Sequence, residues 1–341
     1  MIDDVDVEFH PVEDDNPIWA ETNFFGFYNA PEHLNIGVYA LFRPQLHTVH
    51  STISMNDHDA FEPWRANVFN HQAHLAIPAD AKLSDYTLSN GLHVVCTRPN
   101  MDWHITYDDG EGTTIDVEYA ALMPPFDIHD PEMDPITAAA SKADGFAWGD
   151  AYNGHFDQSG HYRGEVCIRS RRVPIDCVST MDHSWGPRRE RGAPNMSWLH
   201  AHVDDDYAVH AIWSFDHTGE SDALSLNHGY ALVDGQVHGL RSGTGRTTRD
   251  EHLYAREIEL EVTDARGEIH RLSGRGLTRF PWQAWPNMVG FNVLAEWDVN
   301  GRRGYGEIQD FVEAPRLAAL GDRSRAASHA SDASDASDAM R

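Results

Sequence analysis

The chain has 341 residues, of which 41% are hydrophobic and 10% are aromatic, and this composition excludes a wholly disordered protein. Its 54 Asp and Glu residues outnumber its 26 Lys and Arg residues and give a formal net charge of -28. A field of that sign repels phosphate backbones and anionic lipid surfaces, which argues against nucleic-acid binding and membrane-surface binding. The length predicts two domains or one large all-β unit.

Two absences bear on cellular location and redox chemistry. The first residues lack the basic and apolar regions of a signal peptide, and the chain has no run of about 18 apolar residues. We therefore expect a cytoplasmic protein without membrane insertion. The three cysteines, Cys96, Cys167 and Cys177, show no CxxC spacing, which argues against a disulfide framework and against a structural zinc site.

Apolar and polar residues alternate with a period of two through most of the chain, a pattern typical of antiparallel strands. In chain order the alternating segments are LNIGVYALF, LHTVHSTISM, LHVVCTR, DWHITYDDGEGTTIDVEYAAL, HYRGEVCIRSRRVPIDCV, YAVHAIWSF, REIELEVTDARGEIHRLSGRGL and NVLAEWDVNGRRGYGEIQDF. Asp, Gly and Asn predict hairpin turns at Tyr107–Gly110, Asp264–Gly267 and Asn300–Gly301. Helical periodicity is confined to short candidates at Pro135–Lys142 and at the chain end.

The alternation stops in one long segment, at about residues 123–157, where Pro, Asp and Gly interrupt strand pairing. A connection of that length is usually a lid or a linker. We therefore predict an N-terminal β domain over residues 1–150, which includes most of this loop, and a C-terminal β-barrel domain over residues 151–320. The small, polar and repetitive residues 321–341 predict a disordered acidic tail.

The densest group of chemically active side chains is the segment TMDHSWGPRR at residues 180–189. It brings an acid, an imidazole, an indole and two guanidinium groups together directly after a predicted strand. Taken alone, the segment has a purely structural interpretation, in which Asp182 caps a turn, Trp185 fills core and Arg188 pairs with the acid.

Together with its flanks, this segment resembles the hydroxyneurosporene synthase, or carotenoid 1,2-hydratase-like, superfamily and its uncharacterised bacterial branch. The resemblance rests on the signature Asp-His-Ser-Trp-Gly at residues 182–186 and on four residues before it. These four are His155, Gln158, Gly160 and Gly164. The segments WAETNFFGFY at residues 19–28 and GYGE at residues 304–307 match the opening and closing parts of the family, so the similarity extends over residues 16–313.

The resemblance implies an all-β fold of two lipocalin-like antiparallel β-barrel or sandwich domains packed together, with an apolar ligand cavity near their junction. It also implies that an aspartic acid of the signature, here Asp182, protonates an alkene before water captures the carbocation. This chemistry needs a neutral, buried carboxyl group and aromatic faces that stabilise the cation. Positive charge on His183 or Arg188 would instead keep Asp182 ionised, which suits a base or an orienting group.

The candidate substrate-binding residues come from this pattern and from the histidines and tryptophans of the second half. They are His155, Gln158, Trp185, Arg188, Trp198, His200, Trp213 and Trp282. A second acid, Glu307, shares one face of the closing strand with Tyr305 and Gln309. It is either an acid–base partner of Asp182 or an exposed, solvated carboxylate.

Two histidines raise the possibility of a metal site. His200 and His202 lie two apart on a predicted strand and therefore share a face, as metal ligands in some β-barrels do. No obvious carboxylate completes a divalent site, although Asp182 or Glu307 could serve. We therefore expect the two histidines to be structural or exposed to solvent, and we expect no bound metal.

These observations together predict a cofactor-independent lyase or isomerase of the hydratase or dehydratase type. Its substrate is a small hydrophobic terpenoid, polyketide or aromatic molecule, and Asp182, His183 and Glu307 are its candidate catalytic residues. The sequence has no GxGxxG fingerprint, Walker loop or nucleophile elbow, so nicotinamide, ATP and serine-hydrolase mechanisms lack support. The alternatives are a non-catalytic protein that binds a lipophilic ligand and a metal enzyme that uses His200 and His202.

Overall fold

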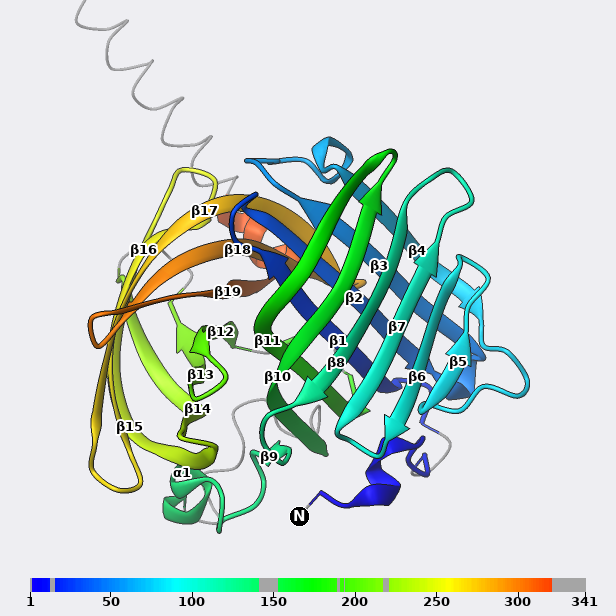
Figure 1. The fold of residues 1–341 in the computed structure, drawn as a ribbon. Helices are drawn as coiled ribbons and strands as arrows, with labels where there is room; N and C mark the ends of the chain where they lie inside the picture. Colours follow the sequence, from blue (N-terminus) through cyan, green and yellow to red (C-terminus); the bar gives the residue numbers. More distant parts are fainter. Residues whose placement is uncertain are drawn as a thin grey trace, which may run out of the picture.

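The computed structural model describes residues 2–12, 16–140, 153–188, 191–192, 194–216 and 221–320 of the chain. Strands account for 66% of the structure and helices for 7%, which confirms the predicted all-β fold class. The strands form two antiparallel units, a half-barrel sheet and a closed barrel, which lie beside each other (Figure 1).

The first unit is an 11-stranded sheet within the described part of the chain, with the order β4-β3-β2-β1-β11-β10-β8-β7-β6-β5 and with β9 paired to β10. Its strands are β1 (Trp19–Asn29), β2 (Leu34–Arg43), β3 (Thr48–Asn56), β4 (Val68–Ala76), β5 (Asp85–Thr87), β6 (Leu92–Arg98), β7 (Asp102–Asp108), β8 (Thr114–Ala121), β9 (Phe126–Asp127), β10 (Gly154–Ile168) and β11 (Arg171–Pro187). The sheet brings distant parts of the sequence together, because β11 pairs with β1 on one side and with β10 on the other.

The second unit is a closed barrel whose consecutive strands pair in sequence order and whose last strand pairs with its first. Its strands are β12 (Asn195–Asp204), β13 (Tyr207–Phe215), β14 (Ala223–Val233), β15 (Gln236–Arg249), β16 (Ala255–Asp264), β17 (Ile269–Trp285), β18 (Met288–Val299) and β19 (Arg302–Glu313).

Helical segments are short. They are η1 (Asp4–Val7), η3 (Pro44–Leu46), η4 (Pro63–Arg65) and α1 (Pro135–Ala139), and residues 314–320 are also helical. Helix α1 lies within the segment predicted from its periodicity. Within the described residues, we find no helix with the length and apolar character needed to cross a bilayer.

The three predicted hairpin turns are confirmed, because each joins two paired antiparallel strands. They connect β7 to β8, β16 to β17 and β18 to β19. In the last of these turns, Asn300 and Gly301 have positive φ angles of 52° and 82°. Two successive residues of this conformation give a turn whose twist matches that of the flanking strands.

Strand β1 belongs to the first sheet, and its two faces pack in different apolar clusters. Residues of β16 alternate between buried and exposed because one face of that strand contacts solvent, whereas nearly every residue of β1 is buried. Phe25 of β1 packs in the core of the half-barrel. Phe24, on the other face, packs in a second apolar cluster with Trp198 and Trp282 of the barrel. This second cluster lies at the junction between the sheet and the barrel.

The chain passes from one unit to the other between Pro187 and Asn195. The predicted division at residues 150 and 151 assigns β10 and β11 to the C-terminal domain, but the strands with which they pair belong to the first sheet. The predicted loop at 123–157 contains β9 and α1, and β10 begins within it at Gly154. Residues 141–152 of that loop and the predicted tail at 321–341 lie outside the described residues.

Candidate functional site

The signature segment lies in β11, and its side chains alternate between the two faces of the first sheet. Strand β11 pairs with β10, and in this pairing Asp182 lies directly opposite Asp157 and Ser184 lies opposite His155. Side chains in direct register share a face of the sheet. These four residues therefore face the barrel, whereas the histidine and the tryptophan of the signature face the opposite side.

A cavity lies between the first sheet and the barrel, and its walls are mainly aromatic and aliphatic. The first unit contributes Thr22, Phe24, Tyr39, Ile128, His155, Asp182 and Ser184. The barrel contributes Met196, Trp198, Ile212, Asn227, His228, Trp282, Ala284, Trp285, Gln309 and Phe311. An apolar cavity with a few converging polar groups is the usual form of a small-molecule site.

Asp157 is a fully buried acid that contacts the cavity residue His155. Its Oδ2 lies 3.0 Å from Nε2 of both His155 and His210, and its Oδ1 accepts a 2.9 Å hydrogen bond from Nε1 of Trp198. Burial opposes the charge of Asp157, but the two histidines outweigh burial and hold the pKa of this carboxyl well below its usual range. Burial also opposes protonation of His155, and the Asp157 carboxylate nevertheless raises the pKa of that imidazole.

Asp182 faces the cavity beside this ion pair. Burial raises the pKa of Asp182 to about 7, and the negative charge of Asp157 acts in the same direction. The positive charges of His155 and Arg188 lower the pKa of Asp182 but do not overcome burial. Burial therefore affects the pKa of Asp182 more strongly than the nearby positive charges do.

Arg188 lies directly after β11 and contacts two residues that line the cavity. Its Nη2 donates a 2.6 Å hydrogen bond to Oγ of Ser184, and that hydroxyl lies 2.7 Å from Oγ1 of Thr22. Its guanidinium group lies over the Trp285 ring, 5.2 Å from the ring centroid. Arg188 therefore orients one polar residue and one aromatic residue that both line the cavity.

Of the eleven predicted site residues, four line the cavity, namely His155, Asp182, Trp198 and Trp282. His183 and Trp185 lie on the opposite face of the sheet, where their rings are 4.9 Å apart. Gln158 shares that face, because it pairs with Met181, two residues before His183, and its amide donates a 2.8 Å hydrogen bond to the carbonyl of Met123. Trp213 is fully buried in the core of the barrel.

His200 and His202 lie in a second polar network at the junction. Their side chains share a face, as the sequence predicts, and their Nδ1 atoms are 3.0 Å apart. Nε2 of His202 lies 2.9 Å from Oγ of Ser159 in the first sheet. Burial lowers the pKa of both imidazoles well below the usual value, so both are neutral.

Glu307 belongs to the same network. Among the described residues, its carboxylate accepts hydrogen bonds from Asn35, at 2.6 Å, and from Gln309, at 3.0 Å, rather than contacting Asp182. The interpretation of Glu307 as an exposed carboxylate is wrong, because the side chain is buried. Burial raises the pKa of Glu307 to about 7.

Sequence reasoning missed several residues of the site. Asp157 carries a usable signal, because it lies two residues after His155 on one strand and must share its face. Tyr39, Asn227 and His228 carry no local signal, because tertiary pairing alone brings their strands to the cavity.

Two antiparallel β units with a mostly apolar cavity between them define the class of this protein, the two-domain β proteins of lipocalin-like type. A family model described as a domain of unknown function (DUF7064) matches residues 3–311, and the chain belongs to that family. A search of curated proteins finds no match.

Two solved structures are similar to this chain. Kievitone hydratase from Nectria haematococca is similar over 90% of this chain and 93% of its own, with a TM-score of 0.50 and 11% identity. A candidate ATTH from Nitrosomonas europaea is similar over 87% of this chain and 93% of its own, with a TM-score of 0.45 and 14% identity. At 11% identity, the likeness to kievitone hydratase shows a shared fold, which agrees with the superfamily fold that the signature implies.

Proposed function

We propose that the protein is a cofactor-independent hydro-lyase or isomerase of the hydratase or dehydratase type. Its substrate is a small hydrophobic terpenoid, polyketide or aromatic molecule bound in the junction cavity. One observation carries the proposal: Asp182 presents its carboxyl group to a cavity whose other walls are mainly aromatic and aliphatic. A carboxyl group in such surroundings is suited to deliver a proton to an apolar substrate.

In the hydration direction, the Asp182 carboxyl group transfers its proton to one carbon of a C=C bond, and the π-electron pair forms the new C–H bond. The adjacent carbon becomes positive, and the faces of Trp198, Trp282 and Trp285 stabilise it. The oxygen of a water molecule bonds to that carbon, and the resulting oxonium returns one proton to the Asp182 carboxylate. The sum is addition of H and OH with the acid regenerated, and dehydration is the reverse.

The charged neighbours of Asp182 have a role in this scheme. When Asp182 gives up its proton it becomes a carboxylate, and positive charge nearby stabilises that product of the transfer. His155 is held in place by its 3.0 Å contact with Asp157, and Arg188 by its hydrogen bond to Ser184. Both groups are therefore held where their positive charge acts on Asp182, and His155 also lines the cavity.

The comparisons support the same class of reaction. One of the similar solved structures is a hydratase by name, and the Asp-His-Ser-Trp-Gly signature supports membership of the uncharacterised bacterial branch of the carotenoid hydratase-like superfamily. A shared fold does not fix a reaction.

The second candidate is a non-catalytic protein that binds a lipophilic ligand, and the predominance of apolar groups in the cavity wall favours it.

Deuterium incorporation tests the proposal across a whole class of substrates at once. The protein is incubated in D₂O with a panel of terpenoid, polyketide and aromatic alkenes and tertiary alcohols, and mass spectrometry detects new C–D bonds. We expect incorporation by the wild type. Asp182→Asn keeps the size of the side chain but has no transferable proton, so we expect its rate to fall about 100-fold or more.

Ligand binding separates the two candidates. Three tryptophans line the cavity, so quenching of their fluorescence reports binding of the same panel, and Asp182→Asn should keep nearly the wild-type affinity. Asp176→Asn is the matched control, because it removes a carboxylate from the same strand whose side chain is 75% exposed. Full activity of Asp182→Asn would overturn the catalytic role, and binding without deuterium incorporation by the wild type would favour the binding protein.

A further inference from the structure

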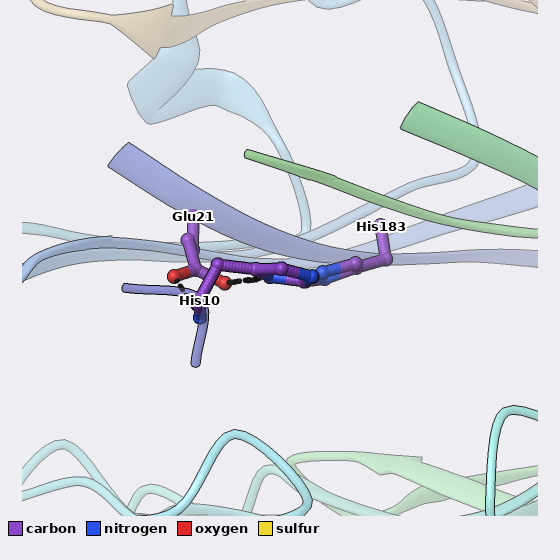
Figure 2. A group of neighbouring side chains, drawn as sticks. All are labelled: His10, Glu21 and His183. Carbon is purple, nitrogen blue, oxygen red and sulfur yellow. Dashed lines mark hydrogen bonds and ion pairs between the residues drawn. The ribbon is translucent and has the colours of Figure 1, made fainter. Parts of the chain in front are cut away.

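The opposite face of the first sheet carries a second cluster of polar side chains, which the proposed reaction does not use. Figure 2 shows its members, His10 from the N-terminal segment, Glu21 from β1 and His183 from β11. One ligand atom of each residue lies within 4.8 Å of the others. Glu21 and His183 are buried, and His10 is partly buried.

His183 aims an unsatisfied nitrogen into this cluster. Its Nδ1 lies 2.8 Å from the carbonyl oxygen of Thr22, and because a carbonyl oxygen accepts, Nδ1 carries the proton. Its Nε2 then presents a lone pair, is buried and has no hydrogen-bond partner among the described residues. The nearest carboxylate oxygen, Oε2 of Glu21, lies 3.9 Å away and is also an acceptor. Two buried acceptors that face each other repel, and either a proton on the carboxyl group or a cation between the two atoms removes this repulsion.

Glu21 directs one oxygen toward the same point. Its Oε1 accepts a 2.7 Å hydrogen bond from the backbone N–H of His10. The other carboxylate oxygen, Oε2, lies 3.0 Å from Nδ1 of His10. A buried carboxylate is stable when it is paired or when it coordinates a metal ion.

His10 is oriented as histidine ligands of metals are. Its Nε2 lies 3.0 Å from Oδ1 of Asp6, in the 3-10 helix η1, and this contact directs Nδ1 toward Glu21. Its ring stacks on the Trp185 indole, with a centroid distance of 3.7 Å and an interplanar angle of 8°. A carboxylate on the outer nitrogen of a ligating histidine is a recurrent feature of zinc sites. A protonated His10 would satisfy Asp6 and Glu21 but would leave Nε2 of His183 without a partner.

We propose that His10 Nδ1, Glu21 Oε2 and His183 Nε2 bind one divalent transition-metal ion, Zn²⁺ in the first place. Ligand atoms of a tetrahedral zinc ion lie about 3.3 Å apart. The distances of 3.0 Å and 3.9 Å to Glu21 Oε2 are each within a small side-chain adjustment of that value. Two histidines and one carboxylate are a donor set found in zinc and iron(II) proteins.

The bound ion would fasten the N-terminal segment to β1 and β11. Val7 of that segment already packs in the half-barrel core, and the Phe9 ring lies 5.1 Å from the Phe42 ring. The site lies on the other face of the sheet from the cavity, so it is independent of the chemistry proposed for Asp182. This assignment departs from the expectation of no metal, and it does not involve His200 or His202.

Metal binding is tested on the full chain without an affinity tag. After treatment with EDTA and dialysis, Zn²⁺ is titrated by calorimetry, and Co²⁺ is added in a parallel experiment as a visible-absorption probe. We expect one tight equivalent of Zn²⁺ and an absorption band typical of a four-coordinate Co²⁺ ion. His10→Gln should lose the tight equivalent, and Asp6→Asn, which removes the positioning carboxylate, should weaken it about 10- to 100-fold.

His161→Gln is the matched control, because the ring of His161 lies 2.6 Å from Asp176 and 2.8 Å from Asp205 at the protein surface. It should bind Zn²⁺ as the wild type does. Circular dichroism checks that each variant is folded, and Glu21→Gln provides a second ligand variant. Tight binding that survives in both His10→Gln and Glu21→Gln, or a wild type without a tight equivalent, would overturn the proposal.

Discussion

Glu307 illustrates how burial sets the charge of an acid at the junction. Its carboxyl group has two hydrogen-bond donors, Asn35 and Gln309, but no cation within contact distance among the described residues. Burial therefore dominates and raises the pKa of Glu307 from 4.5 to about 7. An acid in this position is held mainly by neutral hydrogen bonds, and its ionisation works against the folded state.

The pH dependence of stability follows from this shift. Between pH 4.5 and about 7 the unfolded chain has lost the proton of Glu307 while the folded chain keeps it. The contribution of Glu307 is therefore present in full below pH 4.5, falls as pH rises, and is lost above about pH 7. Relative to Glu307→Gln, the wild type should lose on the order of 3 kcal/mol across this interval.

Urea unfolding of both proteins at several pH values in the interval measures this difference. Glu259→Gln is a suitable control, because Glu259 is 62% exposed and pairs with Arg246 at the surface. Its difference from the wild type should change little with pH. A wild-type-to-Glu307→Gln difference that stays constant over the interval would contradict the raised pKa.

Single residues of the cavity could be predicted where the sequence carries a local pattern. His155, Asp182, Trp198 and Trp282 line the cavity, and all four are candidates from the signature or from the aromatic residues of the second half. The cluster of His10, Glu21 and His183 has no such pattern. Its members are separated by 11 and by 162 positions, so their proximity exists only after β1 has paired with β11.

At the scale of the strand, period-two alternation explains both what was predicted and what was not. The alternating segments cover all or part of β2, β3, β6–β8, β10, β11, β13 and β16–β19, and the turn residues identified three of the hairpins. Strands β1, β4, β5, β9, β12, β14 and β15 lie outside those segments. Alternation also implies that neighbours in the Asp-His-Ser-Trp-Gly signature face opposite sides, which separates the cavity residue Asp182 from His183. Alternation does not select a partner for a strand. The pairing of β1 with β11 therefore lay beyond the sequence, as did the change of sheet after Pro187.

The seam that closes the barrel, between β12 and β19, depends on a close approach at Gly306. A Cβ atom at this position would lie 2.0 Å from the carbonyl oxygen of His200 and 2.7 Å from its Nδ1. The backbone of β12 cannot move away without opening the seam. We expect Gly306→Ala to destabilise the protein by about 1–3 kcal/mol through overpacking.

Gly37→Ala is the matched control for this substitution. Gly37 lies in β2, and the nearest atom to its added Cβ would be Oγ of Ser54 at 3.1 Å, a side-chain atom that can rotate away. Urea unfolding at one pH should give a clearly smaller loss for Gly37→Ala. Equal stabilities of Gly306→Ala and the wild type would contradict the close approach of β12 to Gly306.

At the scale of the whole molecule, the junction joins the sheet and the barrel through apolar and polar contacts at once. An apolar cluster with members from both units lies there, including Phe24, Trp198 and Trp282. Several hydrogen bonds cross it between buried groups, among them those from Trp198 to Asp157 and from Asn35 to Glu307. Interfaces between domains permit relative motion unless they are large and hydrophobic. This one is hydrophobic and also satisfies buried polar groups of both units.

We therefore expect the two units to unfold together. Hydrogen exchange measured by mass spectrometry at increasing urea reports β5–β8 and β15–β17 separately, and both groups of strands should lose protection at the same urea concentration.

Trp198→Ala removes the Asp157 hydrogen bond and an aromatic contact with Phe24, whose ring lies 5.6 Å away. Loss of this ring should cost about 3–5 kcal/mol, and it should separate the two transitions because the penalty falls on the junction. Trp64→Ala, at a tryptophan that is 78% exposed, should leave them coincident. Separate transitions in the wild type would mean that each unit is stable by itself and that the junction contributes little to the fold.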